Sequence, residues 1–197
     1  MGQRQDLLAG AKRCIVEKGY SRTTARDITA ASGANLAAIG YHFGSKEALM
    51  NAAVLDSFEE WGAAIEEVGV DAGGDPLDRF ERFLAGFLEG SVEQRATLVA
   101  SAQAFAEAEF VPEVRRQLAD TYERSRESIG AMLQGVETAE VDESGRRLGS
   151  LVLAIITGTA LQWLIEPEAT PSAADFSRAL RSLVLTGDRG GCESGAS

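Results

Sequence analysis

The residues best suited to chemistry gather in the stretch GYHFGSK, residues 40–46, which contains the only histidine of the chain. An imidazole beside hydroxyl and ammonium groups could serve as a general base or as a metal ligand. His42 has no second histidine and no nearby cysteine, so we expect no metal site and no catalytic role for it. The order Gly-Ser-Lys also lacks the Gly-Lys-Ser/Thr ending of a phosphate-binding loop. We therefore interpret this stretch as a surface that serves a partner, without a cofactor.

The two cysteines offer little alternative chemistry. Cys14 lies on the apolar face of a predicted helix and Cys192 lies in a Gly/Ser-rich tail, so neither a disulfide nor a metal site is predicted. A small helical enzyme with His42 or Cys14 as its reactive group is the rival interpretation. It is weakened because no second polar group accompanies either residue at a plausible spacing.

No segment of the sequence reads as a targeting or membrane-spanning element. The N-terminus is charged and amphipathic, unlike a signal peptide. The longest apolar run, residues 151–165, is shorter than the roughly 18 residues of a membrane span, so it is interpreted as a buried helix. We expect a cytoplasmic protein with no membrane partner.

Charge is distributed unevenly along the 197 residues, whose net charge is −11. Residues 1–50 contain seven basic and four acidic side chains, which gives this segment a net charge of +3. The remainder contains 12 bases and 26 acids, for a net charge of −14. Because docking depends on the local field, the N-terminal segment can approach a polyanion while the acidic remainder stays away from it.

Every periodic segment has helical spacing of its apolar residues, and none shows the sustained two-residue alternation of a strand. The sequence therefore predicts an all-α protein of about nine helices. Two short helices, capped by Thr24 and Asn35 and separated by a turn at Gly33, form a helix-turn-helix. Asp27 lies three residues after Thr24 and approximates a capping box.

The helices divide into two predicted domains. A three-helix head covers residues 1–47, and a larger helical body for ligand binding and dimerisation covers residues 48–187. The last ten residues, DRGGCESGAS (188–197), are predicted to be a disordered tail.

The second short helix presents an outer face suited to nucleic acid. Small side chains would let it seat deeply in a major groove, where Tyr41 and His42 at its far end could reach phosphates or base edges. Ser45 caps the long helix that follows, whose free amides and Lys46 favour a phosphate. The outer face consists of Leu36, Ala37, Gly40 and Tyr41.

These residues carry a resemblance. The stretch TTARDITAASGANLAAIGYHFGSKEALM, residues 23–50, resembles the N-terminal DNA-binding signature of the TetR family of transcriptional regulators, and the likeness covers roughly residues 5–55. The chain departs from the family at Ala34, where valine is usual, and at Gly40, where a larger side chain, commonly tyrosine, is frequent. The second departure leaves the pattern of base reading open.

The resemblance implies roles for individual residues. Phosphate contacts would come from Thr24, Tyr41, His42 and Lys46. Base-edge contacts would come from Arg26 and from the exposed face of the second short helix. Together with the helix cap Asn35, the predicted DNA-binding set is Thr24, Arg26, Asn35, Leu36, Ala37, Gly40, Tyr41, His42 and Lys46.

The penultimate predicted helix, near residues 143–165, is apolar nearly all round and must be covered on two sides. Its own domain can cover one side and a second copy of the chain the other, helped by the last helix near residues 173–185. The TetR resemblance implies the same homodimer, whereas the alternative is an unusually central helix of a monomer. The predicted dimer contacts are Leu148, Val152, Ile155, Thr159, Phe176, Leu180 and Leu183.

Aromatic residues in the middle of the body suggest a small-molecule site. An apolar pocket requires such side chains, although aromatics at helical spacing also form ordinary core. The acidic body favours an effector that is apolar or cationic. The predicted ligand contacts are Trp61, Phe83, Phe87, Phe105, Tyr122 and Trp163.

These features predict a dimeric, ligand-responsive transcriptional regulator, with repression favoured over activation. It would bind a palindromic double-stranded DNA operator and be released by a small-molecule inducer. The resemblance implies that the inducer changes the spacing of the two heads. The alternative is a DNA-binding regulator whose body responds to a protein partner.

Overall fold

The computed structural model describes residues 2–70 and 74–187, with side chains described for residues 2–62 and 74–183. Throughout these residues the regular structure is helical, with nine α-helices and two short 3-10 helices, so the predicted all-α fold is confirmed. The predicted disordered tail, 188–197, lies outside the described residues.

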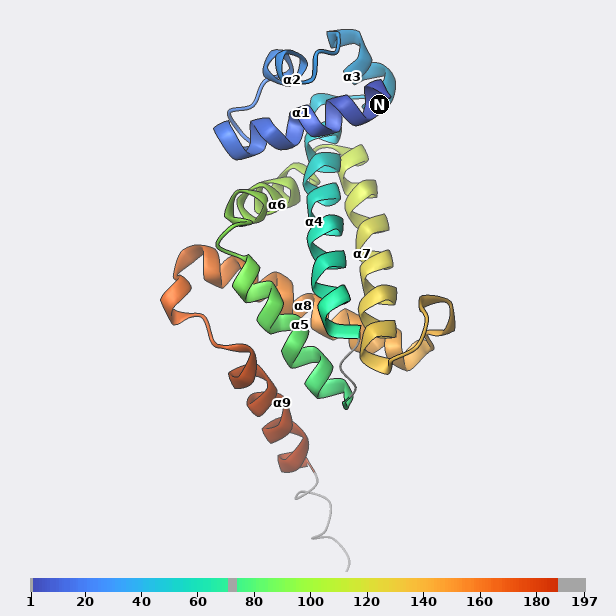
Figure 1. Cartoon of the computed structure of the whole chain (residues 1–197), viewed down its shortest axis with the longest axis vertical. Helices are drawn as coiled ribbons and strands as arrows, with labels where there is room; N and C mark the ends of the chain where they lie inside the picture. Colours follow the sequence, from blue (N-terminus) through green and yellow to red (C-terminus); the bar gives the residue numbers. More distant parts are fainter. Residues whose placement is uncertain (1, 71–73, 188–197) are drawn as a thin grey trace, which may run out of the picture.

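The elements follow one another with short connections. Figure 1 shows the three helices of the head at one end of the molecule, α4 and α7 side by side below them, and α9 at the opposite end, packed on α5. In chain order the elements are α1 (Gln3–Lys18), α2 (Ala25–Ser32), α3 (Leu36–Phe43), α4 (Lys46–Val70), α5 (Pro76–Gly90), α6 (Arg95–Glu107), α7 (Pro112–Gln134), η1 (Thr138–Glu140), α8 (Glu143–Ile165), η2 (Pro167–Ala169) and α9 (Ala173–Gly187).

Local sequence sets the ends of the two short head helices. At the start of α2, the Asp27 amide donates to the Thr24 hydroxyl (3.2 Å) and the Thr24 amide donates to the Asp27 carboxylate (2.9 Å), which completes a capping box. The helix ends at Gly33, whose φ of 72° lies in the left-handed region that favours glycine. At the start of α3 the Asn35 side chain accepts from the Ala38 amide at 2.9 Å.

Two apolar cores meet along α4. The head core combines side chains of α1, α2 and α3 with Leu49, Met50 and Val54 of α4 and with Ala100 of α6. The body core is built from α5 to α9, with Phe58 of α4 packed against both cores. The predicted domain boundary after residue 47 falls in the first turn of α4, and its position stays a prediction.

Glycine allows α7 and α8 to pack almost backbone to backbone. A Cβ atom at Gly149 would overlap the carbonyl oxygen of Arg126, and a Cβ atom at Gly130 would lie 2.5 Å from the carbonyl oxygen of Gly145. No side chain larger than hydrogen fits either position without moving one helix. The close approach fixes which side of α8 faces the interior.

Adding one methyl group at this contact tests the packing. We expect Gly149→Ala to lower the free energy of unfolding by about 1–3 kcal/mol, because rigid backbone opposes the new atom. Urea denaturation followed by circular dichroism measures the change. Gly62→Ala is the matched control inside α4, since no heavy atom lies within 4 Å of its Cβ position. We expect the control to stabilise the chain by about 0.5–1 kcal/mol; a Gly149→Ala variant as stable as wild type would contradict the packing.

Candidate nucleic-acid interface and internal cavity

Helix α3 presents a smooth, exposed face to solvent. Leu36 is 58% and Tyr41 86% exposed, and Ala37 and Gly40 between them are also exposed. A Cβ atom at Gly40 would meet no heavy atom within 4 Å, so packing inside the chain does not require glycine there. Because glycine and alanine have small side chains, the backbone of α3 can come close to the edges of the base pairs on this side.

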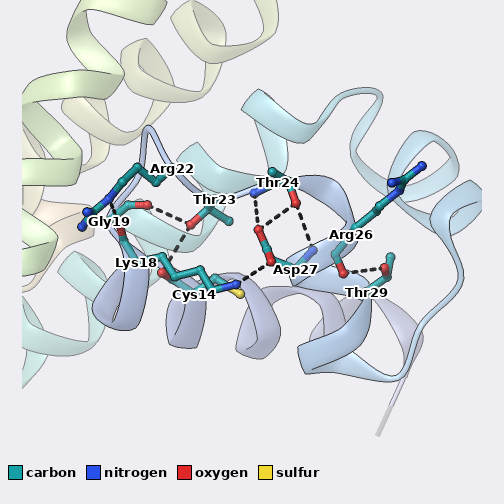
Figure 2. A network of polar contacts seen from close by, with 9 residues as sticks. All are labelled: Cys14, Lys18, Gly19, Arg22, Thr23, Thr24, Arg26, Asp27 and Thr29. Atoms are coloured by element: carbon teal, nitrogen blue, oxygen red, sulfur yellow. Dashed lines mark hydrogen bonds and ion pairs between the residues drawn. The ribbon is translucent and has the colours of Figure 1, made fainter.

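Arg26 differs from the other basic side chains of the N-terminal segment. Residues 1–50 contain seven basic side chains. Of these seven, Arg26 is the one whose charged group contacts no polar group or aromatic ring in the described part of the chain. Figure 2 shows its side chain pointing away from the neighbouring polar network. The other six basic side chains all have partners. Lys12 pairs with Asp56 and Glu60, Lys18 with Asp27, and Lys46 with Glu47 and the Thr23 carbonyl. Arg4 lies over the Phe43 ring, Arg13 donates to the Ala31 carbonyl, and Arg22 donates to the Lys18 carbonyl.

A compact network holds the first turn of α2, from which Arg26 projects (Figure 2). The Asp27 carboxylate accepts hydrogen bonds from the Lys18 ammonium (2.5 Å) and from the hydroxyl of Thr24 (2.7 Å). These bonds, that of Lys18 first, hold the pKa of Asp27 far below its ordinary value of 3.8. Because the Thr24 hydroxyl donates its hydrogen bond to Asp27, it cannot donate to a phosphate while the capping box is formed.

Lys46 lies in the first turn of α4, behind the far end of α3. Its Nζ atom lies 3.3 Å from the carbonyl oxygen of Thr23 and 3.3 Å from the carboxylate of Glu47, and its side chain is 29% exposed. The Ser45 hydroxyl accepts from the Ala48 amide at 3.0 Å, which caps the helix as predicted. The ammonium group is thus held beside a helix N-terminus, where an anion is favoured.

Among the described residues, no polar side chain is hydrogen-bonded to the side chain of His42 or Cys14. The imidazole of half-buried His42 makes edge contacts with the rings of Tyr41 (4.9 Å between centroids) and Phe43 (6.5 Å). Cys14 is 2% exposed, and burial raises the pKa of its thiol, which disfavours the reactive thiolate. Among the described residues, no group of three or more His, Cys, Asp or Glu side chains could hold a metal ion.

An apolar cavity of about 410 Å³ lies in the body between α4, α5, α6, α7 and α8. Trp163, predicted as a ligand contact, does not line it. This residue is buried, and the guanidinium of Arg95 lies over its ring at 5.4 Å from the centroid. The other predicted ligand contacts do line the cavity: Trp61, Phe83, Phe87, Phe105 and Tyr122.

Sequence reasoning missed Phe58 and a row of hydroxyl side chains in the cavity wall. Phe58 precedes Trp61 by one helical turn, and its ring stacks on that indole at 5.8 Å. The hydroxyls on α7 recur at helical spacing, a signal that the sequence did contain. The hydroxyl-bearing wall residues are Ser101, Thr121, Tyr122, Ser125, Ser128 and Thr157.

The outer side of α8 carries an exposed apolar stripe. By length and composition this helix could cross a membrane, a property it shares with apolar helices of other proteins, and only 22% of its most apolar 18-residue window is buried. Ile165 is 85% exposed, and spacings of three and four residues place the stripe on one side of the helix. The stripe consists of the exposed residues Leu151, Ala154, Leu161 and Ile165, with half-buried Gly158 between them.

The predicted dimer contacts divide into different environments. Val152 and Thr159 are 4% and 1% exposed within the single chain, because the side of α8 that carries them packs inward. Leu183 on α9 is 72% exposed. The remaining four, Leu148, Ile155, Phe176 and Leu180, are partly buried against the body core.

The fold and the exposed face of α3 define a helix-turn-helix protein. Residues 7–53 match the family described as bacterial regulatory proteins of the tetR family, and residues 75–186 match the tetracyclin repressor-like C-terminal domain. The chain belongs to the TetR family of transcriptional regulators. Members of this family are DNA-binding regulators, and the enzyme interpretation is set aside on that ground.

Similarity to curated relatives covers about a third of the sequence. The chain is 36% identical over 70 residues to the transcriptional repressor AcnR of Corynebacterium efficiens, a match that covers 36% of this chain and 37% of that protein. It is 35% identical over 68 residues to the transcriptional repressor Rv1474c of Mycobacterium tuberculosis, covering 34% of this chain and 36% of that protein. The chain therefore matches little more than a third of the length of these relatives.

Solved structures share the whole fold. A TetR-family regulator from Rhodococcus sp. superposes with a TM-score of 0.68 at 23% identity, covering 93% of this chain and 99% of that one. A regulator from Saccharomonospora viridis, solved in complex with choline, superposes with a TM-score of 0.62 at 23% identity, covering 92% of this chain and 95% of that one. At such identities the comparison establishes the architecture.

The capping network gives a pH-dependent prediction. Asp27 has a depressed pKa, so its contribution to stability is complete above the ordinary value of 3.8 and is lost as the pH falls toward the folded-state pKa. We expect Asp27→Asn to melt at a lower temperature than wild type at neutral pH, and the difference to shrink in acid. Thermal unfolding followed by circular dichroism across this range measures it. Asp120→Asn removes an exposed carboxylate without a partner in the described chain and should follow wild type; a constant difference for Asp27→Asn would contradict the assignment.

Proposed function

We propose that the chain is a homodimeric, cytoplasmic repressor that binds a palindromic DNA operator through α3 and is released by a small molecule bound in the body cavity. The DNA-binding proposal rests on the exposed face of α3, with its small side chains, and on Arg26, whose guanidinium has no partner in the described chain. Two relatives of the N-terminal segment, AcnR and Rv1474c, are transcriptional repressors, which supports repression as the output.

In this proposal the residues around α3 have separate tasks. The exposed face of α3 enters the major groove, and Arg26 directs its planar fork at a guanine edge, the commonest specific contact there. Tyr41, His42 and Lys46 contact phosphates, which positions the helix without reading sequence. Thr24 and Asn35 act through their caps, because their side-chain oxygens already accept backbone amides.

Substitution of two basic residues distinguishes contacts that recognise the base sequence from contacts that bind phosphates of any sequence. We expect Arg26→Ala to cost about 1–3 kcal/mol on the preferred operator and to relax the preference at one base pair per half-site. Lys46→Ala should weaken all sequences alike and lower the slope of log affinity against log salt by about one unit per head. Fluorescence anisotropy at several salt concentrations, on an operator selected from random DNA and on scrambled DNA, measures both. Equal losses on the two DNAs for Arg26→Ala would assign that residue to a phosphate.

The dimer is proposed to form on the exposed stripe of α8. An apolar helix with one side packed on its own chain and the other in water needs a second cover, and a two-fold operator needs two heads at a fixed separation. The contacts proposed from the structure are those of the stripe, in place of the buried Val152 and Thr159. Leu148 and Ile155 flank the stripe, and Leu183 offers a further exposed contact on α9.

A charge placed on the stripe tests the dimer. We expect Leu151→Glu, at a side chain that is 49% exposed, to leave the chain folded and to separate the copies, because a buried unpaired carboxylate is costly. Sedimentation should show a change from twice the chain mass to 20.9 kDa, together with loss of operator binding. Phe110→Glu is the matched control, since Phe110 lies between α6 and α7, outside the stripe, and is 81% exposed. This variant should stay dimeric. A dimeric Leu151→Glu variant would exclude this face.

The cavity favours a small molecule over a protein partner as the signal. Five helices contribute to its wall, which is mostly apolar and of a size suited to a compact ligand. Val54 and Phe58 of α4 line the cavity and also pack against the head core. A ligand that is accommodated only when α4 moves would therefore favour a second arrangement of the heads with lower operator affinity.

A further inference from the structure

The charge in the cavity wall is neutralised within the protein. Glu59 and Arg124 are the charged side chains that line it in the described chain, and they pair with each other at 2.8 Å. Arg124 also donates to the Thr121 hydroxyl at 3.0 Å, and both members of the ion pair are more than half exposed. A charged ligand would therefore lose its hydration inside the cavity without gaining an unpaired counter-charge.

The aromatic wall is occupied by contacts between its own rings. The indole of Trp61 stacks on Phe87 with centroids 4.7 Å apart and on Phe58 at 5.8 Å, and Phe105 meets Tyr122 edge to face at 5.8 Å. A cation is held by an open aromatic face, and stacking engages the indole that would serve best. The wall is therefore suited to apolar contact.

Hydroxyl groups of α7 and α8 offer hydrogen bonds in the cavity wall. The Thr157 hydroxyl donates to the Leu153 carbonyl at 2.8 Å, so in its 3.3 Å contact with Tyr122 the phenol is the donor and Thr157 the acceptor. The phenolic oxygen of Tyr122 keeps its lone pairs and can accept. Ser125, one turn further along α7, makes no hydrogen bond with its hydroxyl in the described chain and can donate.

We infer that the cavity selects an uncharged, largely apolar ligand with a hydroxyl group, which donates to Tyr122 and accepts from Ser125. This inference rests on the proposed function, because it names the chemistry of the proposed effector. It replaces the broader expectation of an apolar or cationic compound, since the one carboxylate among the described residues of the wall is paired and the indole is already stacked.

Matched naphthalene probes with a hydroxymethyl, aminomethyl, carboxylate or methyl substituent test the inference on the full-length protein. They share size and apolar surface and differ in charge and hydrogen bonding. Isothermal titration calorimetry should show the hydroxymethyl probe binding at least about tenfold more tightly than the ammonium and carboxylate probes. Tightest binding of the ammonium probe, or no binding of any probe, would overturn the inference.

Three variants assign the binding to the cavity and to the hydroxyl. Ser125→Ala should weaken the hydroxymethyl probe severalfold and leave the methyl probe unchanged, whereas Ser144→Ala, at an exposed serine of α8 outside the wall, should change neither. Ala160→Phe fills the cavity from α8 and should weaken all the probes, provided circular dichroism shows a folded chain. Equal affinities of the hydroxymethyl probe for wild type and Ser125→Ala would remove Ser125 from the site.

Operator binding is measured separately, without any probe. Loss of operator recognition with the expected probe ranking would refute the proposed regulator and leave the ligand chemistry standing. Intact operator recognition with a charged probe ranked first would refute the ligand chemistry alone.

Discussion

Helix α4 belongs to both apolar cores, and this shared helix constrains the rest of the structure. Val54 packs in the head core and lines the body cavity, and Phe58 packs against both cores. On its outer side, α4 is tied to α1 by Lys12, which pairs with Asp56 (2.6 Å) and Glu60 (2.8 Å). Because a hydrogen-bonded helix is stiff and close-packed cores do not deform continuously, a displacement of α4 at the cavity also moves the surfaces on which α1 and α3 rest.

Two buried polar atoms where the head meets the body have no hydrogen-bond partner in the described chain. Asn51 is fully buried, and its Nδ2 atom donates to Gln117 at 2.8 Å, but its Oδ1 atom has no partner in the described chain. The hydroxyl of Tyr20 is also buried without a partner there, and burial raises the pKa of this phenol. Unpaired buried polar groups cost free energy, so a rearrangement of this layer that gave these two atoms partners would recover part of that cost.

The parts that the sequence predicts well depend on neighbours along the chain. Thr24, Asn35 and Gly33 cap and end the two short helices through hydrogen bonds and backbone angles that span only a few residues. The parts that it predicts less well depend on fit between distant segments. Val152 was expected at the dimer surface and packs inside, because a glycine contact with α7 that no local pattern reveals sets the rotation of α8.

Net charge overstates the attraction of the head for a polyanion. The segment 1–50 carries +3, yet Lys12 and Lys18 are paired with carboxylates, and the other bases except Arg26 contact carbonyls or rings of the chain itself. Such contacts position helices and leave few cations for phosphates, and each phosphate contact contributes to affinity. In the proposed complex a single head relies on the fit of α3 in the groove, with a modest electrostatic contribution. In the proposed dimer, linking two heads would make the second binding event intramolecular, and this gain in effective concentration would compensate for the weak charge of each one.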